Sequence, residues 1–378
     1  SYVVYNMNDS VSRLYFSVKS SDLLYERSNN TNQLTAHVLL NYILRPVGNT
    51  KTVIDSGHVV LNDVNETGLV KQLAGSVDFD VPEQGMYYLE ITFRDLNKMT
   101  ITYELLSLAH TNVDSRNNFV MTAPGTETPL FRNYVEKNES FILRHNRRET
   151  TKLFVRFFKN ISEAARPPYA YPTTPLEIMP DSSWTIDLTV ADSIRFSEEG
   201  SYYVSSTENS SQGFLICRFP PGYPKITSPV ALLEPLRYIT TKKEYQTLEL
   251  SRNLKAAIDS FWLATGGSED RARELISAYY GRVEIANTHF STGREGWKND
   301  RGMVYFIYGE PQNVYRAFAS ETWVYGQDQG GNMLTFVFDR KTNTFAGNEF
   351  ELQRNQTYNI SWITAVDYWK QGQVYRAK

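Results

Sequence analysis

One short string occurs twice in the 378-residue chain, and the spacing of its two copies limits the folds that the chain can adopt. Glu83–Tyr88 (EQGMYY) is matched by Glu198–Tyr203 (EEGSYY), which begins 115 residues later. That interval is a typical length for an immunoglobulin-like domain. In such domains a tyrosine near the start of a late strand caps a nearby backbone group, and Tyr87 and Tyr202 fit this role. The repeat therefore predicts two tandem β-sandwiches with these tyrosines in equivalent positions.

The strands of these sandwiches are visible as alternating apolar and polar residues. Gln33–Arg45 and Met86–Arg94 alternate with a period of two, which is typical of strands with one buried face. Lys152–Phe158 and Trp184–Val190 are strand-like segments further along. We therefore expect antiparallel, immunoglobulin-like sandwiches over residues 1–115 and 116–228.

The period of the apolar residues changes after the proline-rich turn Pro220–Pro224. Helices are predicted over Thr241–Leu250 and Asn253–Ala264, and a long helix is predicted to begin after the N-cap Ser268. Four strands are predicted after it: Met303–Tyr308, Asn313–Phe318, Thr322–Gly326 and Met333–Asp339. The last part, residues 229–378, is thus predicted to be an α+β domain.

Composition and motifs argue against several classes of function. A net charge of −3 with both signs interspersed argues against nucleic acid as the main partner. The single cysteine, Cys217, excludes an intrachain disulfide and lies in an apolar run where thiols are usually inert. The five histidines are scattered without metal-ligand spacing, and no nucleophile elbow, phosphate loop or dinucleotide fingerprint occurs. We therefore predict a protein that is not an enzyme and needs no metal or cofactor.

The densest group of informative residues is Gly296–Pro311 (GWKNDRGMVYFIYGEP). Asp300 and Arg301 are adjacent, so they cannot easily pair with each other, and each is expected to hold a different neighbour. We expect Arg301 or Arg282 to fork onto a carboxylate, with Trp297 stacked over a guanidinium. The stretch would then be a polar latch between helix and sheet. The alternative is a ligand or catalytic site around Asp300, Arg301 and Glu310.

With the helix before it, this stretch resembles the GWxTD domain family over about residues 236–340. The residues that carry the resemblance are Tyr280, Arg282-Val283, Ala286-Asn287, Gly296-Trp297, Asp300-Arg301-Gly302 and Tyr308-Gly309-Glu310-Pro311, with Phe261-Trp262 upstream. One position departs from the pattern, because the family's threonine before the aspartate is Asn299 here. If that hydroxyl were a nucleophile in the family, this member would lack it.

The resemblance implies a location but no established activity. GWxTD proteins are known chiefly from the cell envelope of Bacteroidota and related bacteria, often as lipoproteins. We therefore expect a periplasmic or outer-membrane protein, held by a lipid anchor that is outside this chain, which opens at Ser1 rather than Met. Asp9-Ser10-Val11 and Asp192-Ser193-Ile194 match the O-glycosylation sites of such bacteria, at Ser10 and Ser193.

The sequence is compatible with two functions from different classes. The first is a non-catalytic adaptor that binds other envelope proteins in a larger assembly, such as secretion or β-barrel assembly machinery. Its contact surfaces would be the proline-rich loop Arg166–Pro180, with Tyr169 and Tyr171 exposed, and the rim Gly326–Asn332. The second is a carbohydrate-binding protein or glycan hydrolase, since tandem sandwiches with exposed aromatic residues commonly bind glycans.

Overall fold

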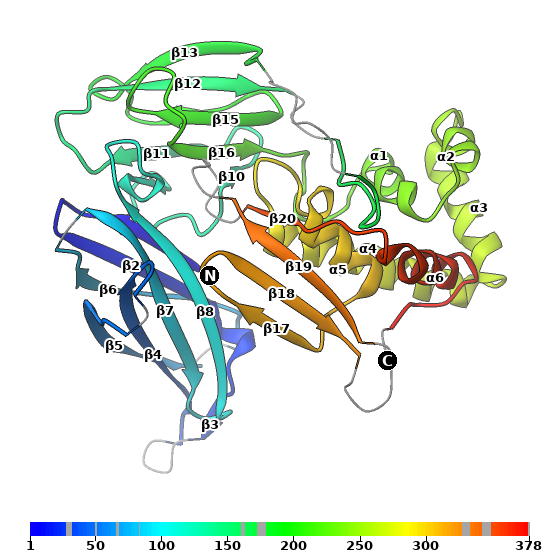
Figure 1. The fold of residues 1–378 in the computed structure, drawn as a ribbon, viewed down its shortest axis with the longest axis horizontal. Helices are drawn as coiled ribbons and strands as arrows, with labels where there is room; N and C mark the ends of the chain where they lie inside the picture. The colour runs from blue at the N-terminus through cyan, green and yellow to red at the C-terminus, as the bar shows by residue number, and fades with distance from the viewer. Residues whose placement is uncertain are drawn as a thin grey trace.

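The computed structural model describes residues 1–27, 32–49, 51–65, 68–82, 84–159, 163–171, 179–326, 333–341 and 349–376. These residues form two units built from antiparallel sheets and a last unit that holds all six α-helices described. Figure 1 shows the first unit in blue to cyan at the lower left, the second unit mainly in green at the top, and the helices on the right. The orange strands β17, β18 and β19 lie between the first unit and the helices.

The first unit is a sandwich of two sheets. Its strands are β1 (Tyr2–Asn6), β2 (Val11–Lys19), β3 (Glu26–Arg27), β4 (Leu34–Pro46), β5 (Asp55–Val64), β6 (Gln72–Asp80), β7 (Gly85–Asp95) and β8 (Thr100–His110). One sheet has the order β1-β2-β6, and the other has the order β3-β4-β7-β8 with β5 paired to β4. Alternate side chains from both sheets, such as Leu14, Leu40 and Leu89, are fully buried in one shared core.

The second unit repeats the order of seven of these strands. It contains β9 (Phe119–Thr122), β10 (Tyr134–Val135), β11 (Ser140–His145), β12 (Lys152–Phe158), β13 (Ser182–Asp187), β14 (Ile194–Arg195), β15 (Gly200–Ser205) and β16 (Phe214–Arg218). The sheet β9-β11-β14 corresponds to β1-β2-β6, and β13-β12-β15-β16 corresponds to β5-β4-β7-β8. Strand β10 is an addition that pairs in parallel with β16.

The two repeated tyrosines therefore fall on equivalent strands, as the repeat predicts. Tyr87 lies on β7, between β4 and β8, and Tyr202 lies on β15, between β12 and β16. Tyr202 also has the predicted capping role, because its hydroxyl donates to the carbonyl of Glu198 at 2.7 Å. Glu83, the first residue of the other copy, is outside the described residues.

The last unit packs helices against a four-stranded sheet. The helices are α1 (Pro229–Leu233), α2 (Lys242–Glu249), α3 (Leu254–Gly266), α4 (Glu269–Phe290), α5 (Asp300–Tyr308) and α6 (Tyr358–Lys370). The sheet has the order β17 (Asn313–Arg316), β18 (Ser320–Tyr325), β19 (Leu334–Arg340) and β20 (Phe350–Leu352). Short 3₁₀ turns lie at Ser20–Asp22, Arg116–Asn118, Glu234–Tyr238 and Gly296–Lys298. The core is rich in aromatic residues, and Trp262, Trp297 and Trp369 are at most 1% exposed.

One element is of the opposite type to the prediction. Met303–Tyr308, expected as a strand, belongs to helix α5. A short apolar run is compatible with a buried helix as well as with a strand, and all of α5 except Tyr305 is buried. The N-cap predicted at Ser268 is confirmed, since its side chain accepts from the first turn of α4. The helix predicted from Thr241 is also found, and the Thr241 side chain caps it. Helix α6 and strand β20 were not foreseen.

The three units contact one another directly. Arg316 on β17 reaches β8 of the first unit, where it donates to the carbonyl of Tyr103 at 3.3 Å and lies 3.7 Å from Glu104. The second unit contacts the last unit through Ser201, whose hydroxyl donates to the carbonyl of Gly293 at 2.6 Å. Among the described residues, no helix combines the length and apolar composition needed to cross a membrane.

Candidate functional site

Two glycines of the signature stretch allow helix α4, the Gly296–Lys298 turn and helix α5 to pack in direct backbone contact. A Cβ atom at Gly296 would lie 1.9 Å from the carbonyl oxygen of Ala286 on α4. A Cβ atom at Gly302 would lie 1.9 Å from the carbonyl oxygen of Gly296. No side chain fits at either place, because real contacts of this kind need more than 3 Å. These glycines are therefore required by the approach of three backbone segments.

Asn299 begins helix α5. Its side-chain oxygen accepts a hydrogen bond from the backbone of Gly302 at 2.9 Å, which is the standard N-cap contact. The side-chain nitrogen of Asn299 donates to the carbonyl of Phe290 at the end of α4. Threonine is also a good N-cap residue. The threonine of the GWxTD pattern and the asparagine found here can therefore perform the same structural task, which weakens the reading of that position as a nucleophile.

Asp300 joins helix α5 to strand β20. Its carboxylate accepts from the backbone of Leu352 at 2.8 Å and is forked by the guanidinium of Arg354, one of whose contacts measures 3.1 Å. Both side chains are about nine-tenths buried, at 9% and 10% exposed. The matched charges and hydrogen bonds of this pair offset the cost of removing both groups from water.

Arg301 holds a different partner, as the sequence predicts. Its guanidinium lies 3.3 Å from the carboxylate of Glu321 on β18 and packs over the ring of Phe350 at 4.1 Å. Burial lowers the pKa of Arg301 to about 10, although Glu321 opposes this shift. Arg301 and Asp300 thus form ion pairs with different partners, Glu321 and Arg354.

Trp297 is 1% exposed and packs edge-on against Tyr238 and Phe306 in the core. The expected stacking over a guanidinium is wrong, because the cation near its ring is the ammonium of Lys298, 5.2 Å from the ring centre. Burial opposes the charge of Lys298, but Glu295 and Glu234 raise its pKa.

The turn before Trp297 is held by hydrogen bonds to buried polar side chains. The backbone of Trp297 donates to the side chain of Asn287 at 3.2 Å, and the backbone of Gly296 donates to the hydroxyl of Tyr223 at 3.2 Å. Tyr223 in turn donates to the carbonyl of Asn287 at 3.0 Å. These bonds connect α4, the turn and the Pro220–Pro224 segment.

Arg282 closes the other end of helix α5 and is not forked onto a carboxylate. It donates to the carbonyl of Ile307 at 3.2 Å and to that of Tyr375 at 2.8 Å. A cation at the carbonyl end of a helix is favourable. Gly309, with φ of +91°, passes so close that a Cβ atom there would lie 2.8 Å from this guanidinium.

The remaining signature residues lie around the end of α5. Tyr308 is buried, with its hydroxyl 3.3 Å from that of Ser361 on α6. Pro311 is half-buried and Glu310 is exposed. The structure therefore brings Asp300 and Arg301 together at one end of α5 but leaves Glu310 at the other end.

The proline-rich segment is only partly the exposed loop that was expected. Tyr169 packs against the core of the last unit, and its carbonyl accepts from Gln356 at 2.7 Å. Ala165 is hydrogen-bonded to the carbonyl of Lys298 at 2.8 Å, beside the signature. Tyr171 is 75% exposed, as expected. Residues 172–178 and 327–332, which complete the two predicted contact loops, are outside the described residues.

The other sequence candidates lie away from the signature helix. Cys217 is fully buried, and burial raises the pKa of its thiol to about 12. Ser10 and Ser193 are both exposed. Within the described part of the chain, no group of three or more histidine, cysteine, aspartate or glutamate side chains could hold a metal ion.

Sequence reasoning missed three partners of the signature: Tyr223, Glu321 and Arg354. Each comes from a segment far along the chain, and no local pattern links it to Gly296–Arg301. Only Tyr223 carried a signal, since it stands inside the proline-rich turn that marks the start of the last unit.

The chain thus consists of two β-sandwich units followed by a domain of helices and a sheet. In that domain, buried ion pairs of Asp300 and Arg301 hold the start of helix α5. Residues 200–371 match the family model described as the GWxTD domain, which confirms the resemblance found in the sequence. The match begins in strand β15 and therefore includes two strands of the second sandwich, β15 and β16, which contact Thr292 and Gly293 just before the signature stretch. No curated protein matches the chain.

Proposed function

We propose that the chain is a non-catalytic adaptor of the bacterial cell envelope, which binds other envelope proteins. The observation that carries this proposal is the use of the signature residues. Trp297, Asp300 and Arg301 are all at most 8% exposed, and each is engaged with neighbours inside the fold. A catalytic carboxylate needs access to a substrate, whereas Asp300 is enclosed by Arg354 and the backbone of β20.

The two sandwiches support the role of a spacer. Their matching strand orders favour an immunoglobulin-like assignment for both, and tandem domains of this kind commonly set the distance between binding surfaces. The contacts of β8 with β17, and of Ser201 with Gly293, join them to the last unit. The location, in the periplasm or at the outer membrane through a lipid anchor, remains part of the proposal.

The partner surface includes the exposed ends of the proline-rich segment. Tyr171 is 75% exposed and Met179 is 76% exposed, while Tyr169 fixes the segment to the domain core. Aromatic and methionine side chains that protrude from a fixed backbone are typical contact residues in interfaces. Stable binding of this kind would bury at least about 1,000 Å² and survive moderate salt.

The test is purification of the tagged protein from its native envelope in mild detergent, followed by mass spectrometry of what accompanies it. We expect defined envelope proteins to copurify, and Tyr171→Ser to reduce their amount. Tyr315→Ser is the matched control, because Tyr315 is a 63% exposed tyrosine on β17. A lone protein that binds or cleaves a glycan or peptide, with activity lost in Asp300→Asn, would contradict the adaptor role and support the carbohydrate alternative.

A further inference from the structure

A cavity of about 710 Å³ lies where the three units meet. Glu104 of the first unit, Phe119 and Phe214 of the second, and Tyr305 and Trp323 of the last are among the residues that line it. Its volume is within the range of small-molecule sites, and sites of this kind occur preferentially between domains. The adaptor role proposed above makes no use of this cavity.

Charged side chains gather where the last unit meets the first unit in the cavity. Arg301, Arg316 and Arg340 line it together with the carboxylates of Glu321 and Glu104. Arg301 and Arg316 both approach one oxygen of Glu321, at 3.3 Å and 3.7 Å, while the indole of Trp323 donates to the other oxygen. Lys341 and Glu310 of the last unit also line the cavity, so four of the charged groups named here are cationic and three are carboxylates.

Two of these guanidinium groups, those of Arg301 and Arg340, lie close to the ring of Phe350. The carbon at the centre of the guanidinium lies 4.1 Å from the ring centre in Arg301 and 4.6 Å in Arg340. Arg340 is further fixed by a hydrogen bond of 2.8 Å from its Nε to the carbonyl of Phe318. Positions fixed in this way are suited to binding an anion, because little side-chain entropy remains to be lost.

The surroundings disfavour the positive charges. Burial lowers the pKa of both Arg301 and Arg340, and in each case this effect exceeds the attraction of the nearby carboxylates. An additional negative charge in the cavity would offset this loss of hydration. Guanidinium groups bind carboxylate and phosphate with particular strength, because their planar N–H donors match the geometry of these anions.

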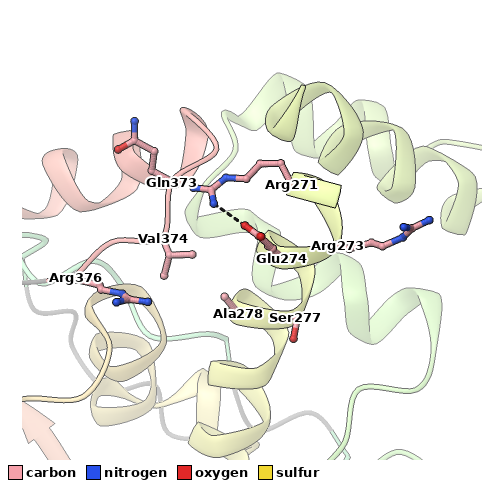
Figure 2. A pocket seen from close by; sticks show the side chains of 8 residues that line it. All are labelled: Arg271, Arg273, Glu274, Ser277, Ala278, Gln373, Val374 and Arg376. Carbon is pink, nitrogen blue, oxygen red and sulfur yellow. Dashed lines mark hydrogen bonds and ion pairs between the residues drawn. The ribbon is translucent and has the colours of Figure 1, made fainter. Parts of the chain in front are cut away.

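A second group of arginines lies elsewhere and differs in kind. Figure 2 shows the open groove between α4 and the segment after α6, lined by Arg271, Arg273 and Arg376. Arg271 pairs there with Glu274 at 2.7 Å, and Arg273 points away toward its own partners, Glu269 and Asp270. This groove is open, and Arg271 and Arg273 are paired with carboxylates of the same helix. It therefore serves as the control site in the binding experiment described below.

We propose that the cavity between the three units binds a small anionic ligand, whose carboxylate or phosphate group is held by Arg340, Arg316 and Arg301 beside Phe350. Because all three units line the cavity, the bound ligand also stabilises their arrangement. The ligand is thus a small molecule that regulates or completes the packing of the units, independently of the envelope partners proposed above.

The experiment is isothermal titration of the purified chain with citrate and, separately, with inorganic phosphate, at constant ionic strength set with chloride. We expect at least one probe to bind saturably and to raise the melting temperature. Citrate alone would indicate a carboxylate ligand, and phosphate alone would indicate a phosphorylated one. Absence of saturable binding for both probes would overturn the proposal.

Variants then locate the site. Arg340→Gln, and separately the less buried Arg316→Gln, should weaken binding of the same probe by at least about tenfold, which is the loss expected for one charge-assisted contact. Arg376→Gln in the outer groove should leave the affinity unchanged. If both cavity variants bind as tightly as the wild type, or if Arg376→Gln abolishes binding, the site is not in this cavity. Two variants are used so that the misfolding of one leaves the other to decide.

Discussion

Gly296 shows at the scale of single residues how the signature acts. Its hydrogen atom lies where a methyl group would overlap the carbonyl of Ala286. Gly296→Ala should therefore force the turn away from α4 and lower the free energy of unfolding by about 1–3 kcal/mol. Chemical denaturation of the purified protein measures this change.

The same helix supplies the control for that experiment. Gly281 lies in the middle of α4, and a Cβ atom there would have no neighbour within 4 Å. Gly281→Ala should stabilise the protein by about 0.5–1 kcal/mol, because alanine favours the helix. If both substitutions had the same effect, the close approach at Gly296 would not explain the glycine.

Trp297 is the largest side chain of the signature and is almost fully buried. Trp297→Ala should lower the free energy of unfolding by about 3–5 kcal/mol, since it removes an indole from a packed aromatic core. Trp184 on β13 is 38% exposed, so Trp184→Ala should lower the free energy of unfolding by clearly less. An unchanged melting profile for Trp297→Ala would indicate a surface-binding role for Trp297 instead.

Sequence reasoning at this scale predicted what kind of contact each residue makes, but not its partner. The adjacency of Asp300 and Arg301 was sufficient to predict that they hold different neighbours, and the structure confirms this. Their partners Glu321 and Arg354 lie 20 and 54 residues further along the chain. Such pairings depend on how β18 and β20 fold back onto α5, which no local pattern specifies.

Helix α5 is the element on which the sequence and the structure differ most. Its apolar residues are nearly continuous because both sides of the helix are covered by other elements, so no helical period remains visible. The signal that could have identified the helix is Asn299, a good N-cap residue three positions before Gly302. Strands with one buried and one exposed face, and the amphipathic helices, were predicted correctly, because their apolar residues recur with a visible period.

The N-cap of α5 can be tested by two substitutions at one position. Asn299→Ala removes the bond to Gly302 and should cost about 1 kcal/mol of stability, within a range of about 0.5–2 kcal/mol. Asn299→Thr keeps an N-cap oxygen and should cost less. Equal losses in thermal or chemical denaturation would show that the cap does not account for this position.

At the scale of the whole molecule, buried tyrosines predict how stability depends on pH. Burial raises the pKa of Tyr2, Tyr5, Tyr42 and Tyr202 to about 12. In the unfolded chain these hydroxyls ionise near pH 10, about two units earlier. Unfolding therefore releases protons above about pH 10, so the stability is fully present below that pH and falls as the pH rises toward 12.

Urea denaturation on both sides of pH 10 measures this loss. The midpoint should fall steadily above about pH 10, and Tyr202→Phe should make the decline shallower by removing one of the groups. A midpoint independent of pH in this range would mean that these hydroxyls are not protected in the folded chain.

The most direct test of the central claim is a double-mutant cycle on Asp300 and Arg354. If the signature locks the fold, Asp300→Asn should cost about 3–5 kcal/mol of unfolding free energy, because it leaves a buried guanidinium without its partner. Arg354→Met alone should also destabilise the protein. The double variant should be less destabilised than the sum of the two by about 0.5–3 kcal/mol. A stable Asp300→Asn protein with no coupling to Arg354, and with a binding or catalytic activity lost, would contradict the claim.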